Sequence, residues 1–130
     1  MEPKFSQKIG QLGEQLACRY LEARGYKILV KNFRIPGGEI DLITQKNFCL
    51  TFFEIKTRQN NRFGEMEEAI SKFQRNALMR AAHTYLDRQK SFSSQRTVHE
   101  VQFDMLAIEI KIISSKKTAY LKHYKNIFLE

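Results

Sequence analysis

Apolar residues in the first part of the chain recur at steps of three and four positions, which is the period of one helix face. The stripe is formed by Ile9, Leu12, Leu16 and Tyr20. Gly25 then follows Arg24. Glycine is common directly after a helix because it adopts a left-handed conformation without strain. The pattern predicts an amphipathic helix from Phe5 to Arg24.

The period then shortens to two, which is typical of β-strands. Three strand-forming segments follow one another, at residues 26–33, 39–44 and 48–57. The short connection before the third segment predicts an antiparallel hairpin. Further on, we predict a second helix, a fourth strand, and a tail of open type, at residues 65–88, 98–111 and 118–128. The order indicates an α/β fold, in which a mixed sheet is flanked by helices.

Length and composition limit the class of protein. The chain has 130 residues, of which 42% are hydrophobic and 28% charged, so we expect one folded domain over residues 1–130. No apolar run reaches the roughly 18 residues of a membrane span, and no signal-peptide core is recognised near the first residue. Cys18 and Cys49 have neither zinc-ligand nor disulfide-scaffold spacing. We expect a cytoplasmic protein without a membrane partner.

The charge favours a polyanionic partner. Lys and Arg number 22 against 14 for Asp and Glu, which gives a net charge of +8. An excess of this kind attracts nucleic acid, the most abundant intracellular polyanion. An acidic protein, an anionic membrane surface, or solubility alone remain alternatives.

Two acidic segments of the predicted hairpin could carry chemistry. If the hairpin is centred between Lys46 and Asn47, Glu39 lies opposite Glu54 and Asp41 lies opposite Phe52. Because side chains alternate across a strand, Asp41, Glu54 and Lys56 then share one face. Asp41 and Glu54 would be diagonal neighbours, about 7 to 8 Å apart at the backbone.

This arrangement suits a hard divalent cation. Mg²⁺ prefers oxygen ligands and keeps several waters, so Asp41, Glu54 and a main-chain carbonyl would supply half of its ligands. Lys56 would reach a metal-bound water or a phosphate, which is the equipment for phosphodiester hydrolysis. The alternative is a solvated sheet face on which Lys56 forms an ordinary salt bridge.

Motifs along nearly the whole chain resemble those of the YraN-like family of small bacterial proteins. The residues that carry the resemblance are Gly13-Glu14, Gly25-Tyr26, Pro36 to Ile43, Phe53 to Arg58, Phe63-Gly64, Lys72 to Leu86 and Phe103-Asp104. That family is similar to a minimal PD-(D/E)XK nuclease, the fold of archaeal Holliday-junction resolvases and of restriction-endonuclease cores. The resemblance therefore implies a restriction-endonuclease-like core in this chain.

The resemblance also implies roles for individual residues. Asp41 and Glu54 match the Mg²⁺ or Mn²⁺ ligands of the D…ExK signature, and Lys56 matches its catalytic lysine. Glu14 matches a helix carboxylate that many such nucleases use as a further catalytic and metal-binding group. From the pattern alone, Glu14 is equally compatible with a solvated helix flank.

Basic residues near these motifs are candidates for nucleic-acid binding. Lys72 and Arg75 lie three positions apart, which places them on one helix face. Arg58 and Arg62 follow the third strand segment, close to Lys56. Each of these four residues is also compatible with an ordinary solvated surface.

The sequence thus predicts a metal-dependent nuclease that acts on DNA. A non-catalytic nucleic-acid-binding module of the same fold is the first alternative, and a domain that binds an acidic protein is the second. A homodimer is compatible with the cutting of two strands by one site per chain. His83, His99 and His123 have no metal-ligand spacing and are assigned no role.

Overall fold

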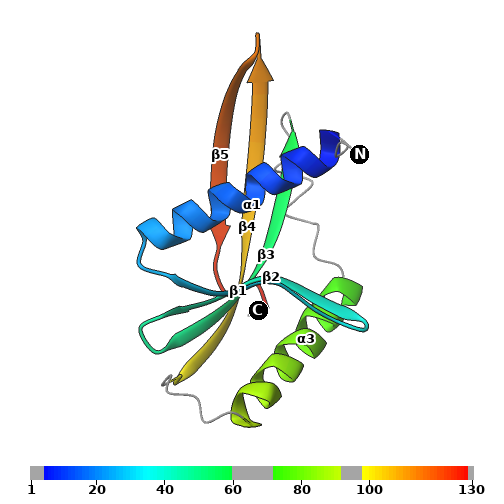
Figure 1. Cartoon of the computed structure of the whole chain (residues 1–130), viewed down its shortest axis with the longest axis vertical. Coiled ribbons are helices and arrows are strands. Elements are labelled where there is room, and N and C mark those ends of the chain that lie inside the picture. The colour runs from blue at the N-terminus through cyan, green and yellow to red at the C-terminus, as the bar shows by residue number, and fades with distance from the viewer. Residues whose placement is uncertain (1–4, 60–71, 92–97, 129–130) are drawn as a thin grey trace.

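The computed structural model describes residues 5–59, 72–91 and 98–128 of the chain (Figure 1). Its helices and strands are α1 (Phe5–Ala23), β1 (Lys27–Ile35), β2 (Gly38–Lys46), β3 (Cys49–Gln59), α3 (Lys72–Ser91), β4 (Glu100–Ile113) and β5 (Lys116–Tyr124). The predicted first helix and all predicted strands are present. The tail, whose type the pattern left open, forms β5.

The five strands form one mixed sheet in the order β1-β2-β3-β4-β5. β3 and β4 are parallel, and every other neighbouring pair is antiparallel. A parallel pair requires a crossover, and α3 lies in the connection between β3 and β4. The α/β class with a mixed sheet flanked by helices is therefore confirmed.

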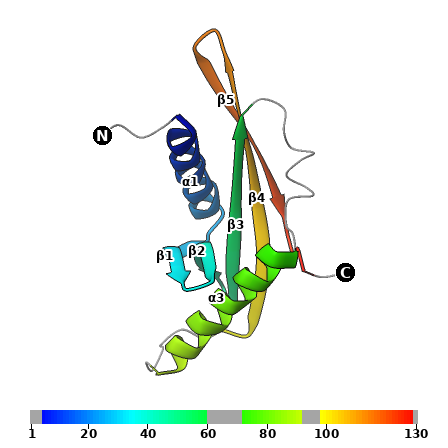
Figure 2. The ribbon, with the colours of Figure 1, turned by 90° about the vertical axis from the view of Figure 1, so that its right-hand side faces the viewer.

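The two helices belong to different hydrophobic clusters. Side chains of α1 pack with Leu42, Phe53 and Leu106, whereas those of α3 pack with Ile43 and Phe52. Leu42 and Phe53 are paired across the sheet, as are Ile43 and Phe52, so adjacent pairs point to opposite faces. α1 thus covers one face, along β3 and β4, and α3 lies against the other face near the β1–β2 hairpin (Figure 2).

None of the helices in the described part of the chain is long and apolar enough to span a membrane.

The hairpin register differs from the prediction. Lys46 pairs with Cys49 and Leu42 with Phe53, so the turn consists of Asn47 and Phe48. Asn47 has a φ of 55°, a left-handed conformation that asparagine tolerates better than most residues. The partners are shifted by two residues from the predicted pairing. Because a shift of two preserves the face of every side chain, the shift brings the acidic residues closer instead of separating them.

β2 separates from β3 beyond the Leu42–Phe53 pair. Its pairing with β1 continues to Gly38, but no pair with β3 is formed there. Ile40 packs in the α3 cluster although Leu42 packs in the α1 cluster, so the strand turns between them. A Cβ at Gly38 would lie 2.5 Å from the carbonyl oxygen of Ala77, so only glycine allows this approach to α3. The result is a fork between two neighbouring strands.

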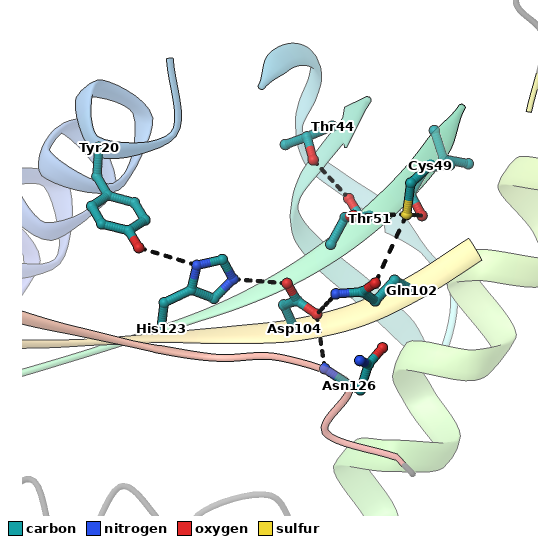
Figure 3. A network of polar contacts seen from close by, with 9 residues as sticks. Tyr20, Thr44, Cys49, Thr51, Gln102, Asp104, His123 and Asn126 are labelled. Carbon is teal, nitrogen blue, oxygen red and sulfur yellow. Dashed lines mark hydrogen bonds and ion pairs between the residues drawn. The ribbon is translucent and has the colours of Figure 1, made fainter. Parts of the chain in front are cut away.

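A buried polar network fastens β5 and α1 to the centre of the sheet (Figure 3). The Asp104 carboxylate accepts hydrogen bonds from the Gln102 side chain at 2.8 Å and the Asn126 N–H at 3.0 Å. His123 Nε2 lies 2.7 Å from Asp104 Oδ2, the second carboxylate oxygen. His123 Nδ1 lies 3.2 Å from the Tyr20 hydroxyl. Because a buried carboxylate without partners is costly, this network keeps Asp104 stable within the sheet.

The contact between α1 and β3 predicts opposite effects for two glycine substitutions on one helix. A Cβ at Gly13 would collide with the Thr57 side chain, whereas a Cβ at Gly10 would meet nothing within 4 Å. We expect Gly13→Ala to lower the free energy of unfolding by about 1 to 3 kcal/mol. We expect Gly10→Ala to raise it by up to about 1 kcal/mol, because alanine is the better helix former. Urea denaturation of both variants would measure the difference, and equal effects would refute close packing at Gly13.

Candidate functional site

The candidate site lies at the fork between β2 and β3. Asp41 and Glu54 are the residues that follow the last ladder pair, Leu42–Phe53. In place of a backbone partner, the Asp41 carboxylate accepts a hydrogen bond of 2.7 Å from the Ile55 N–H. An unpaired strand N–H needs an acceptor, and this bond holds Asp41 against β3.

Glu54 and Lys56 extend the site along β3. Lys56 Nζ lies 3.3 Å from Glu54 Oε1, and the two side chains are 14% and 19% exposed. Their neighbour Thr57 packs against Gly13 of α1, so Glu54 and Lys56, which alternate with it, point to the face opposite α1. Asp41, Glu54 and Lys56 therefore come together as the sequence predicts.

The two carboxyl groups perturb one another. Burial and, to a smaller extent, the negative charge of Glu54 together raise the pKa of Asp41 to about 7, with a lesser effect from Glu39. The Asp41 and Glu54 carboxyl groups are near enough to share a proton, which also favours protonated Asp41, while the Ile55 N–H opposes these effects. At neutral pH the Asp41 carboxyl group is therefore only partly ionised.

The donor set fits a hard divalent cation. Carboxylate oxygens are ligands that Mg²⁺ and Mn²⁺ prefer, and a cation between Asp41 and Glu54 would offset their repulsion. In residues 5–59, 72–91 and 98–128, no three His, Cys, Asp or Glu side chains gather as a metal site. The described part of the chain would thus supply two side-chain ligands, and Mg²⁺, which commonly keeps several waters, accepts so few.

Glu14 lies away from this pair. Its carboxylate accepts a hydrogen bond of 2.9 Å from Asn32 on β1. Glu14 also lines a small polar pocket with Cys18 and Lys31, between α1 and β1. The structure therefore does not bring Glu14 into contact with Asp41, Glu54 or Lys56, and its role as a metal ligand stays a prediction.

Two of the four predicted nucleic-acid-binding residues, Arg58 and Arg75, have described side chains, and they lie on different elements. Arg58 is exposed and donates a hydrogen bond of 2.9 Å to the Thr57 carbonyl. The guanidinium of Arg75 lies 4.8 Å from the centre of the Phe128 ring. Arg62 and the side chain of Lys72 lie outside the described residues. Of the two whose side chains are described, Arg58 adjoins the site along β3, two residues beyond Lys56.

The Asp104–His123 contact is a buried polar feature that the pattern did not predict. Its members are 19 positions apart on different strands, and their spacing resembles no motif. His123 nevertheless has a buried side chain, 8% exposed, that links α1 to β4. Only the β4–β5 pairing, which the open tail did not reveal, could have indicated this contact.

The raised pKa of Asp41 predicts how stability depends on pH. Its ordinary value is 3.8, so between about pH 4 and pH 7 the unfolded chain loses a proton that the folded protein retains. The contribution of protonated Asp41 to the free energy of unfolding is fully present below pH 4 and is lost as the pH rises to 7. The loss approaches about 1.4 kcal/mol per pH unit.

Asp41→Asn provides the matched measurement, because the amide oxygen can still accept the Ile55 N–H. Denaturation of both proteins between pH 4 and 8 should show a steeper loss of stability in the wild type. Parallel curves would show that Asp41 has an ordinary pKa.

Comparison with known proteins extends these observations. A family profile described as "Uncharacterised protein family UPF0102" matches residues 13–108, which include the site. A UPF0102 protein of Syntrophomonas wolfei is 37% identical over 124 residues, or 95% of this chain and 100% of the relative. One from Geobacter metallireducens is 32% identical over 123 residues, or 95% of this chain and 93% of the relative. The chain therefore belongs to the UPF0102 (YraN) family, as its motifs predict.

Proposed function

We propose that the protein is a metal-dependent nuclease that cleaves DNA at the fork between β2 and β3. The observation that carries the proposal is the convergence of Asp41, Glu54 and Lys56 there, with the pKa of Asp41 raised to about 7. An ordinary solvated salt bridge would not place a second carboxyl group beside Glu54 in a partly buried site. A partner cation gives this arrangement a physical reason.

Each residue of the site has a distinct task in this proposal. Asp41 and Glu54 hold Mg²⁺ or Mn²⁺, and the Ile55 N–H fixes the Asp41 carboxylate in position. When bound, the metal would acidify a water molecule and offset charge on the phosphate. The Lys56 ammonium, restrained by Glu54 at 3.3 Å, is available to donate a hydrogen bond to a phosphate oxygen or to orient that water.

The architecture supports the same proposal. In the described part of the chain, one helix lies on each face of a mixed sheet, and the acidic residues lie where two central strands diverge. This arrangement is compatible with a restriction-endonuclease-like core. The net charge of +8 would draw a DNA backbone toward the protein.

A non-catalytic nucleic-acid-binding module is the second candidate. The position of Glu14 favours it, because this carboxylate is bonded to Asn32 instead of joining the Asp41–Glu54 pair. A site with fewer protein ligands holds a cation more weakly. The function would then be binding without cleavage, driven by the net positive charge of the protein.

A cleavage assay separates these two functions. Wild-type protein would be incubated with single-stranded, duplex, flapped and four-way-junction DNA in Mg²⁺, Mn²⁺ or a chelator. We expect metal-dependent cutting of at least one substrate, and a loss of roughly 10²-fold or more in Asp41→Asn, Glu54→Gln and Lys56→Met. Each substitution removes one charge that the proposed site requires.

Glu39→Gln is the matched control. Glu39 lies on the same strand as Asp41, but its side chain is 46% exposed and paired with Arg34. We expect this variant to cut like the wild type. If Asp41→Asn, Glu54→Gln and Lys56→Met all cut DNA as fast as Glu39→Gln does, the fork is not the nuclease site. Gel shifts without cutting would support the binding module.

A further inference from the structure

β4 and β5 form a long two-stranded ribbon, residues 107–122, of which residues 111–118 extend beyond the rest of the sheet. β3 ends at Gln59, which pairs with Ile110, whereas β4 extends to Ile113 and pairs there with Lys116. Figures 1 and 2 show the ribbon projecting past the end of β3. Among its side chains, Ile113 beside the turn is 69% exposed and Tyr120 is 48% exposed. From residue 109 onward, the ribbon lies beyond the residues that the family profile matches.

The ribbon carries an excess of basic residues. Its four lysines are Lys111, Lys116, Lys117 and Lys122, and its one acidic residue is Glu109. Glu109 has a buried side chain, and its Oε1 lies 3.7 Å from Lys111 Nζ. Three of the lysines belong to β5, which forms an edge of the sheet. Lysines on an edge strand oppose the addition of a strand from a second copy of the chain, because the like charges repel. The same charges attract a polyanion.

The strand register places most of these lysines on the face that carries the candidate site. Lys56 pairs with Ala107, and Ala107 pairs with Lys122, so Lys56 and Lys122 point to the same side of the sheet. By alternation, Lys111 and Lys116 point there too. Lys111 Nζ lies 5.1 Å from the centre of the Tyr120 ring, which confirms that these two side chains share that face.

Lys117 points the other way. It pairs with Ile112, which packs against the hydrophobic cluster of α1 on the opposite face. Lys111, Lys116 and Lys122 therefore lie on the same face as the candidate site, whereas Lys117 lies on the opposite face and can serve as a control.

The reach of the ribbon matches a nucleic-acid duplex. From Ala107, at the level of Lys56, to Ile113 at the tip, β4 advances six residues, or about 20 Å at about 3.3 Å per residue. That length corresponds to roughly six base pairs of duplex at about 3.4 Å each. A two-stranded β-ribbon also fits the major groove of DNA.

We propose that the β4–β5 ribbon is a second DNA contact, in which Lys111, Lys116 and Lys122 bind backbone phosphates of a duplex arm. These phosphates lie up to roughly six base pairs from the one held at the Asp41–Glu54 pair. The ribbon thus selects substrates with a double-stranded arm on one side of the cleavage position. This inference rests on the proposed nuclease function for the position of the cut.

Two double variants test the inference at equal net charge. Lys116→Gln with Lys122→Gln removes two charges from the site's face. Lys117→Gln with Lys27→Gln is the control, because Lys27 lies on β1 at the opposite edge of the sheet and is exposed. Binding to a duplex would be measured by fluorescence anisotropy in chelator over a series of salt concentrations, so that no cleavage occurs.

We expect the site-face variant to flatten the dependence of log affinity on log salt by about 1.8, because each lost phosphate contact changes it by about 0.9. The control should keep the wild-type slope. In a second measurement, wild-type affinity should increase as the duplex arm is lengthened to roughly six base pairs, and the site-face variant should lose most of this increase.

The outcomes separate the ribbon from the nuclease. Equal slopes in the two double variants would overturn the ribbon contact even if the wild type cuts DNA. A slope change in the site-face variant alone would support the ribbon even if no DNA is cut, and the nuclease proposal would then fail by itself. Absence of DNA binding by the wild type, or a dimer that the site-face substitutions alter, would also overturn the ribbon contact.

Discussion

The hydrogen bond from the Ile55 N–H to the Asp41 carboxylate is the interaction on which the candidate site depends. β2 leaves β3 after the Leu42–Phe53 pair, and this bond occupies the first backbone donor that the separation exposes. A regular ladder through this point would satisfy Ile55 without a side chain. Because the ladder stops, the Asp41 carboxylate is held beside Glu54. The Lys56 ammonium lies 3.3 Å from Glu54 and therefore belongs to the same cluster of charges.

The surroundings of the fork explain why it is maintained. The β2 end of the fork approaches α3 through Gly38, and the β3 side is held against α1 where Thr57 meets Gly13. Away from the fork, the Asp104–His123 contact fastens β5 to β4 on the face that α1 covers. The strands are therefore fixed on both faces, while the carboxyl groups between them repel. The cost of that repulsion is the physical reason for our proposal that a cation completes the site.

Local sequence patterns predict most of the elements but not their exact pairing. The helix from Phe5 and the alternating strands follow from periodicity, because each buries one face. The hairpin register was predicted one position away at the turn, since nothing in the pattern shows that Asn47 adopts a φ of 55°. Face assignment survived this error, because the partners shift by two and side chains alternate.

Contacts between distant segments could not be predicted in the same way. The carboxylate of Glu14 is directed by Asn32, a residue on a strand whose position relative to the helix depends on tertiary packing. The link from His123 to Asp104 requires β5, which the tail did not specify. The ribbon likewise exists because β4 and β5 extend beyond the last residue of β3. This is a property of the assembled sheet and not of any one strand.

The most direct test of the central claim is a magnesium titration followed by carboxyl ¹³C NMR. The spectra would be recorded above pH 7, where Asp41 is largely ionised, with the exposed Glu39 as internal reference. A cation site at the fork predicts saturable shifts of the Asp41 and Glu54 carboxyl signals, while that of Glu39 stays nearly unchanged. Equal small drifts of all three signals would show that the fork does not hold a divalent cation.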